Sequence, residues 1–125
     1  MATIMLVDDS RSIRELVSHT LKDAGHQVLQ AENGAQGVEI ASKSDLDLVL
    51  TDLNMPVMNG IECTRGIRAL PRHESTPILL VTTESQLKKK NAAKEAGANG
   101  WVVKPIPPQR LMQLVTKVLA KYVHA

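Results

Sequence analysis

A chain of 125 residues is long enough to bury one hydrophobic core and too short for a second, so we expect a single domain over residues 1–125. A formal net charge of +2 gives no reason to expect nucleic acid as a partner, and a single cysteine excludes an internal disulfide and fits a reducing compartment. The N-terminal residues lack the basic leader of a signal peptide and no apolar stretch approaches the ~20 residues of a membrane helix, so we expect a soluble, cytoplasmic protein without a membrane partner.

Apolar runs and helical periodicities alternate along the sequence. Five short runs centred on Val, Ile or Leu predict strands, at residues 4–7, 27–31, 47–51, 78–82 and 101–103. Apolar residues at helical spacing predict helices after each of them, at 13–24, around 38–41, at 61–70, at 85–96 and at 111–119. This alternation predicts an α/β fold, a doubly wound sheet of five strand–helix units with helices on both faces.

Polar residues stand where four of these apolar runs end: Asp8 and Asp9, then Asp52, then Thr82, then Lys104. Short runs that are almost wholly apolar are typical of strands buried on both faces of a parallel sheet. If the four strands are parallel, the polar residues converge at their carboxyl ends, which is the edge where open α/β sheets bind ligands. Carboxylates, a hydroxyl and an ammonium group in one crevice indicate a site for a divalent cation and a phosphoryl group.

The three carboxylates of this crevice favour a bound cation. Close together and uncompensated, they would repel one another and resist ionisation. A hard ion that prefers oxygen ligands, keeps several waters and also binds phosphate is Mg²⁺. The alternative for Asp8 and Asp9 is that they only cap the first helix, but one cap needs one residue.

Four motifs resemble those of two-component receiver domains: Val7-Asp8-Asp9-Ser10, Thr51-Asp52-Leu53-Asn54-Met55-Pro56, Val81-Thr82-Thr83 and Val103-Lys104-Pro105. They cover the whole chain in the order of that family and near its spacing. Thr82-Thr83-Glu84 and the terminal helix are similar to the stand-alone chemotaxis regulators of the CheY type. The resemblance implies a flavodoxin-like parallel sheet of strand order 2-1-3-4-5 and a receiver domain without an output domain.

The resemblance also implies the chemistry of the site. Asp52 would be the phosphoacceptor, whose carboxylate becomes an aspartyl phosphate. Asp9, Asp52 and the backbone carbonyl of Asn54 would bind Mg²⁺ directly, and Asp8 through a coordinated water. Lys104 would neutralise a phosphoryl oxygen together with Mg²⁺. The alternative for Lys104 is an ordinary exposed lysine at the end of a strand.

Two further pairs of residues have roles implied by the family. The hydroxyl of Thr82 would move onto the phosphoryl group, and the ring of Trp101, where relatives usually carry Tyr or Phe, would follow it. Asn54 and Glu84, each two residues beyond a site residue, would set the lifetime of the acyl phosphate. The alternatives are that Trp101 is a half-buried strand residue and that Asn54 and Glu84 are plain loop residues.

The resemblance implies partners rather than a conventional enzyme activity, apart from self-phosphorylation by acyl phosphates and autodephosphorylation. A histidine kinase similar to CheA would donate the phosphoryl group, and a phosphatase is a further candidate partner. The target, a flagellar motor switch protein or another protein, would bind the face made by the helix at 85–96, the strand at 101–103 and the closing helix. The lysines at 88–90 would steer an acidic partner there, or simply form a solvated surface.

Other functions use part of the same pattern. A phosphorelay intermediate or phosphate sink would exchange the phosphoryl group with a histidine-containing transfer domain. A flavodoxin-like electron carrier fits the size, but the chain is almost without aromatic residues, and Asp8 and Asp9 would repel a phosphate. A phosphatase with an aspartate nucleophile would need a substrate-selecting insertion, and the chain offers none large enough.

Overall fold

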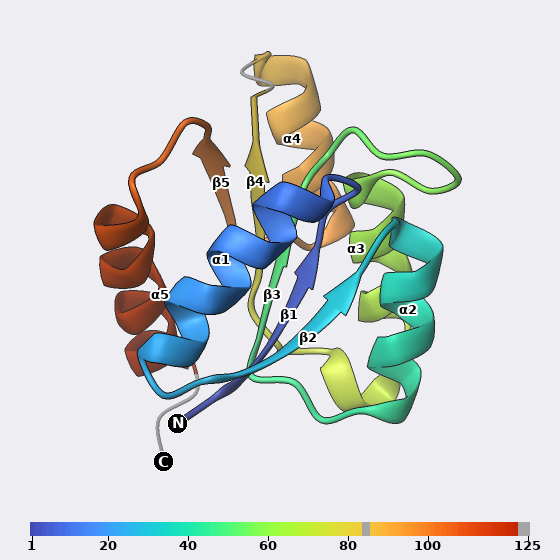
Figure 1. The fold of residues 1–125 in the computed structure, drawn as a ribbon. Coiled ribbons are helices and arrows are strands. Elements are labelled where there is room, and N and C mark those ends of the chain that lie inside the picture. Colours follow the sequence, from blue (N-terminus) through green and yellow to red (C-terminus); the bar gives the residue numbers. More distant parts are fainter. Residues whose placement is uncertain (84–85, 123–125) are drawn as a thin grey trace.

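The computed structural model describes residues 1–83 and 86–122. Within these ranges, strands alternate with α-helices from end to end (Figure 1). The strands are β1 (Thr3–Val7), β2 (Gln27–Ala31), β3 (Leu48–Thr51), β4 (Ile78–Thr82) and β5 (Gly100–Val103). The helices are α1 (Arg11–Asp23), α2 (Gly34–Lys43), α3 (Gly60–Arg68), α4 (Leu87–Ala96) and α5 (Pro108–Tyr122), with a 3₁₀ turn, η1, at Pro71–His73.

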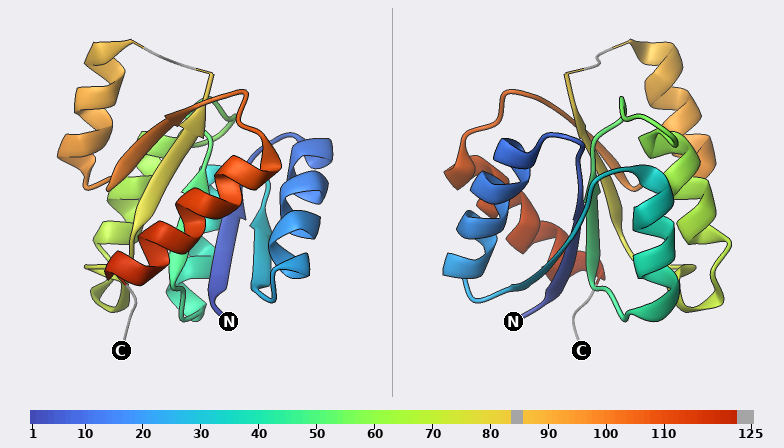
Figure 2. Two further views of the ribbon diagram at one scale, coloured as in Figure 1. Left: turned by 90° about the vertical axis from the view of Figure 1, so that its left-hand side faces the viewer. Right: turned by 45° about the vertical axis from the view of Figure 1, so that its right-hand side comes forward.

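The strands form one parallel sheet in the order β2-β1-β3-β4-β5. This confirms the predicted doubly wound fold and its strand order. Helices α1 and α5 cover one face of the sheet, and α2, α3 and α4 cover the other (Figures 1 and 2). The strand after β1 lies on one side of it and the later strands lie on the other, so the order of the strands reverses between β1 and β3. Ligands of open α/β sheets bind at the carboxyl ends of the strands at such a switch point.

The core has two parts, one on each face of the sheet. Along β1, Ile4 and Leu6 pack in the cluster beneath α1 and α5, whereas Met5 and Val7 pack in the cluster beneath α2, α3 and α4. Successive side chains of a strand point to opposite faces, and here both faces are covered. The strands are therefore apolar at consecutive positions, which is why their sequences do not alternate with polar residues.

The ends of the elements differ little from the prediction. β3 begins at Leu48, one residue later than expected, and the side chain of Asp47 accepts a hydrogen bond from the Thr3 N–H at 2.8 Å. α5 continues beyond the predicted end to Tyr122. α4 begins at Leu87; Ser85, where the sequence predicts its start, lies outside the described residues. In the described part of the chain, no helix is long and apolar enough to cross a membrane.

Candidate functional site

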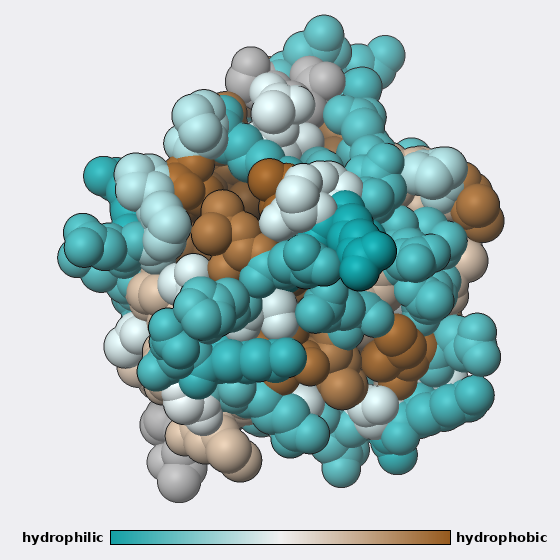
Figure 3. Space-filling view, in the orientation of Figure 1, coloured by the Kyte–Doolittle hydropathy of each residue, from teal (hydrophilic) through white to brown (hydrophobic). Residues whose placement is uncertain are grey.

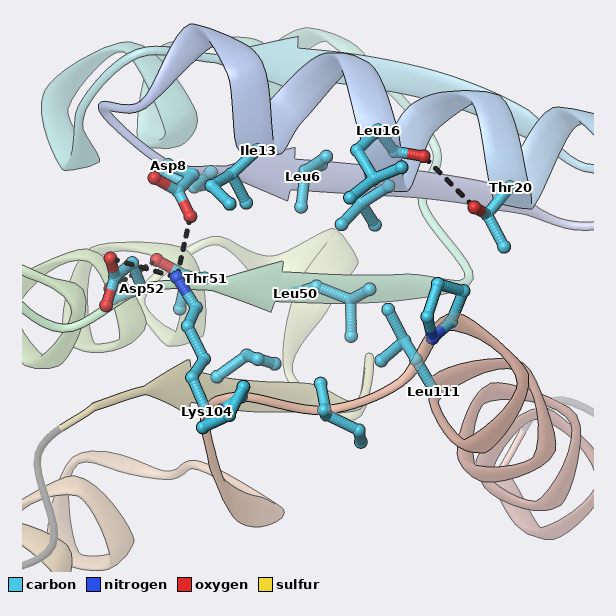
Figure 4. Close-up of a pocket in the computed structure, with 16 residues that line it drawn as sticks. Leu6, Asp8, Ile13, Leu16, Thr20, Leu50, Thr51, Asp52, Lys104 and Leu111 are labelled. Atoms are coloured by element: carbon cyan, nitrogen blue, oxygen red, sulfur yellow. Dashed lines mark hydrogen bonds and ion pairs between the residues drawn. The ribbon is translucent and has the colours of Figure 1, made fainter.

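The carboxyl ends of four strands converge in one crevice, as the sequence predicts. Asp8 directly follows β1, Asp52 directly follows β3, Thr82 ends β4 and Lys104 directly follows β5. Figure 4 shows the side chains of Asp8, Asp52 and Lys104 pointing toward one another. Residues far apart in the sequence are thus brought together because the parallel strands all end at this edge.

Three carboxylates form the acidic wall of the crevice. One side-chain oxygen each from Asp8, Asp9 and Asp52 lies within 4.8 Å of the other two. Asp8 is buried, Asp52 is half-buried and Asp9 is exposed, so the cluster runs from the interior to the mouth of the crevice. This set of oxygen donors is of the kind that a hard divalent cation binds.

Lys104 bridges two of these carboxylates. Its Nζ lies 3.0 Å from Oδ2 of Asp8 and 3.3 Å from Oδ2 of Asp52. Burial by itself lowers the pKa of Lys104, but the hydrogen bond and charge of Asp8, with those of Asp52, outweigh it, so the pKa is raised above its ordinary value. Lys104 is therefore not the freely exposed lysine of the alternative interpretation, and its shorter contact is to Asp8.

The start of α1 fixes Asp8 without using it as the helix cap. Ser10 is the N-cap residue, and its hydroxyl accepts from the N–H of Ile13 at 3.4 Å. Oδ1 of Asp8 accepts from the N–H of Ser10 at 2.9 Å, which leaves Oδ2 facing the crevice. The alternative that Asp8 and Asp9 only cap α1 is therefore wrong, because Ser10 fills that role.

Asp52 is held on both its main chain and its side chain. Its N–H donates to the carbonyl of Val7 at 2.9 Å, and its Oδ1 accepts from the N–H of Leu53 at 2.7 Å. The start of α3 lies close behind it, since a Cβ at Gly60 would collide with the Asp52 carbonyl oxygen. Only glycine fits this close approach. The carboxylate is thus positioned before any ligand arrives.

Thr82 and Trp101 lie on the same face of neighbouring strands. Thr82 pairs with Val103 and Leu80 pairs with Trp101 in the β4–β5 register, so the side chains of Thr82 and Trp101 both point toward the α4 side. Thr82 is fully buried and Trp101 is half-buried. The Thr82 carbonyl accepts from the Lys104 N–H at 2.8 Å, which joins the two predicted site residues directly.

Of the two positions predicted to set the phosphoryl lifetime, only Asn54 lies among the described residues. Asn54 lies exposed in the connection between β3 and α3, two residues beyond Asp52. Glu84 lies outside the described residues. The role of both positions stays a prediction.

Sequence reasoning missed one residue that shapes the crevice. Arg14 looks like a surface charge of α1, yet its side chain is buried and its Nη1 donates to the Asp8 carbonyl at 2.6 Å. The spacing of Arg14 in the sequence could have indicated its burial, because it lies four and seven residues before Ser18 and Leu21, the other buried residues of α1. Arg14 thereby ties the first strand–helix connection to the helix that follows it.

Comparison with known proteins agrees with this geometry. A family model described as the response regulator receiver domain matches residues 4–116. A chemotaxis protein CheY homologue of Campylobacter jejuni is 39% identical over 118 residues, which are 93% of this chain and 91% of the relative.

Two solved structures extend the comparison. The chemotaxis protein CheY4 of Vibrio cholerae is 44% identical with a TM-score of 0.91, covering 95% of this chain and 99% of that chain. The response regulator TrrA of Thermotoga maritima, solved in complex with Mg²⁺ and BeF, is 32% identical with a TM-score of 0.84, covering 95% and 100%.

Proposed function

Because this chain belongs to the response regulator receiver family and is of the CheY type, we propose that it is a signalling switch controlled by phosphorylation of Asp52. The observation that carries the proposal is the crevice itself. One carboxylate oxygen each from Asp8, Asp9 and Asp52 lies within 4.8 Å of the other two, and Lys104 Nζ lies 3.0 Å from Asp8 and 3.3 Å from Asp52. Little else is needed for phosphoryl transfer, which depends on positioning and charge neutralisation.

The proposed metal site uses the acidic wall. Asp9, Asp52 and the backbone carbonyl of Asn54 would bind Mg²⁺ directly, with Asp8 acting through a water. The fit rests on the donors, which are all oxygen, and on their separation of at most 4.8 Å for the three carboxylates. When bound, Mg²⁺ would supply positive charge for the carboxylates and for the incoming phosphoryl oxygens.

In the proposed transfer, an oxygen of Asp52 bonds to phosphorus as the bond between phosphorus and the kinase histidine breaks. Lys104 would then bind an oxygen of the phosphoryl group, because its Nζ already lies 3.3 Å from Asp52 Oδ2. Thr82 would donate its hydroxyl to another phosphoryl oxygen. These groups are preorganised around the charge that develops, which is the usual source of catalysis in such sites. Autodephosphorylation by water would be tuned by Asn54 and Glu84.

The proposed output is a change on the α4-β5-α5 face. Thr82 would move toward the phosphoryl group, and Trp101, on the same face of the neighbouring strand, would follow. A groove of about 380 Å³ lined by Trp101, Val103, Arg110 and Leu114, among others, lies beside β5 and α5 and supports target binding there. Lys88 and Lys90 are exposed at the start of α4 and would attract an acidic partner.

The relatives favour a chemotaxis assignment for this switch. A CheA-like histidine kinase would be the donor, a flagellar motor switch protein or another protein the target, and a phosphatase an additional partner. The phosphorelay or phosphate-sink alternative uses the same crevice but needs no target on the α4-β5-α5 face.

The proposal is tested by incubating the protein with Mg²⁺ and acetyl phosphate while following intact mass and the fluorescence of Trp101, the only tryptophan. We expect a single phosphoryl adduct that Asp52→Asn or chelation of Mg²⁺ abolishes, together with a change in Trp101 fluorescence. No adduct under any of these conditions would contradict the proposed phosphoryl chemistry. An adduct without a fluorescence change would contradict the proposed switch.

A further inference from the structure

An apolar pocket of about 280 Å³ lies between α1 and α5, next to the acidic crevice. Figure 3 shows apolar surface gathered in this hollow, and Figure 4 shows its interior. The walls come from α1, from the carboxyl halves of β1, β3 and β4, from the β5–α5 connection and from the first turns of α5. The side chains that define it best are Ile13, Leu16, Leu50, Ile106 and Leu111.

The polar groups on the wall already have partners within the protein. The hydroxyl of Thr20 donates to the Leu16 carbonyl at 3.0 Å, and that of Thr51 donates to the Asp52 carbonyl at 2.9 Å. The ammonium of Lys104 lies between two carboxylates at the end of the pocket. Water in the remaining space would meet mostly carbon and form few hydrogen bonds, so an apolar molecule can replace it favourably.

Size and charge restrict the ligand. An apolar cavity of roughly 150 Å³ holds benzene, so a pocket of about 280 Å³ has room for two fused rings. Asp8 and Asp52 stand at one end of it with Lys104 between them, and two negative charges against one positive charge leave this end acidic, so it would repel an anion. Their carboxylate oxygens, each with a spare lone pair, can accept one more hydrogen bond.

We propose that the pocket between α1 and α5 binds a neutral, compact aromatic molecule of one or two rings that carries a single hydrogen-bond donor for its acidic end. Leu16, with 54% of its surface exposed, forms the rim through which such a molecule enters. The binding does not depend on phosphoryl transfer. It adds a small-molecule site to a protein whose other proposed partners are proteins.

Indole is the probe that matches these requirements. It is titrated into the protein without Mg²⁺ or phosphodonor, and binding is followed by the ¹³C-methyl NMR signals of Ile13, Leu16 and Val17. We expect saturable shifts at these methyl groups. Indole-3-acetate, which has the same rings and a negative charge, should bind about tenfold more weakly or worse because of the acidic end. Equal binding of the two molecules would overturn the proposed ligand class.

Two variants test the location. Leu16→Asp places a charge on the apolar rim and should weaken indole binding about tenfold or more. Leu87→Asp makes the same change at an exposed leucine of α4, 70% exposed and outside the pocket, and should leave it unchanged. Thr20→Phe should exclude indole by filling the space. No saturable shift in the parent protein, unchanged binding in the folded Leu16→Asp and Thr20→Phe variants, or shifts at Leu114 and Val103 instead would refute the site.

Discussion

Val57 has a backbone conformation that its side chain disfavours. It is the single non-glycine residue with positive φ (70°) among residues 1–83 and 86–122, and its side chain is 82% exposed. A left-handed conformation costs a residue with a Cβ roughly 1–2 kcal/mol, and a branched Cβ makes it worse. Val57 lies between Asp52 and α3, so the strain sits in the connection that borders the crevice.

Replacement of Val57 by Asn should therefore stabilise the protein. Asn tolerates the left-handed region, and we expect the free energy of unfolding in urea to rise by about 1 kcal/mol. The same change at Val103, an exposed valine in β5, should lower it, because β-branched residues favour strands. Equal effects at both positions would show that hydrophobicity, not backbone strain, decides the outcome.

Cys63 should be chemically silent in the folded protein. It is fully buried in α3, and burial raises the pKa of its thiol to about 12. At pH 8 the thiolate fraction is then about one in ten thousand, and an alkylating reagent cannot reach the buried sulfur. Iodoacetamide followed by intact mass should label the protein rapidly in urea and hardly at all in buffer. Native labelling at the rate of a free thiol would disprove this burial.

At the scale of elements, one guanidinium connects three segments at the amino end of the sheet. Arg68, at the end of α3, donates to the carbonyls of His73 at 2.8 Å, Thr76 at 2.6 Å and Gly97 at 3.0 Å. It also donates to Oδ1 of Asn99 at 2.7 Å, and that oxygen accepts from the first residue of β4 as well. Arg68 thus joins α3 to the connections that precede β4 and β5.

Arg68→Lys should destabilise the protein although it keeps the positive charge. A lysine ammonium has no planar fork and leaves several of these acceptors without a donor, so we expect a loss of about 3 kcal/mol in the free energy of unfolding. Arg65→Lys, an exposed arginine of the same helix, should change it by less than about 0.5 kcal/mol. The comparison is made by urea denaturation, and similar losses for both variants would count against the proposed connection.

For the molecule as a whole, the sequence predicts what local chemistry controls. Apolar runs ending in polar residues were enough to predict the parallel sheet and the crevice that holds Asp52 and Lys104, because parallel strands all end at one edge. The roles of Arg14 and Arg68 were not predicted, since their partners are mostly backbone carbonyls, with the side chain of Asn99, that only the folded chain brings within reach. The pocket between α1 and α5 was missed for the same reason: it depends on how closely two helices approach, which periodicity does not specify.

We expect the stability of the whole molecule to depend on the metal proposed for the acidic crevice. Asp8, Asp9 and Asp52 lie close together, and Lys104 contacts two of them, so three negative charges face one positive charge and repel one another without a cation. A cation that binds only the folded state stabilises it by about 2.7 kcal/mol at a concentration 100 times its Kd. We therefore expect the free energy of unfolding to rise with Mg²⁺ concentration and to fall again on chelation.

Asp9→Asn separates this effect from general ionic strength. The variant should be more stable than the parent without Mg²⁺, because one repelling charge is gone, yet it should gain far less from Mg²⁺ because a ligand is lost. Asp45→Asn, a carboxylate 97% exposed ahead of β3, should respond to Mg²⁺ as the parent does. Urea denaturation across a Mg²⁺ series gives both quantities. If Asp9→Asn gains as much from Mg²⁺ as the parent, the stabilising ion binds elsewhere. If its stability without Mg²⁺ also equals that of the parent, the carboxylates of the crevice do not repel one another enough to lower the free energy of unfolding.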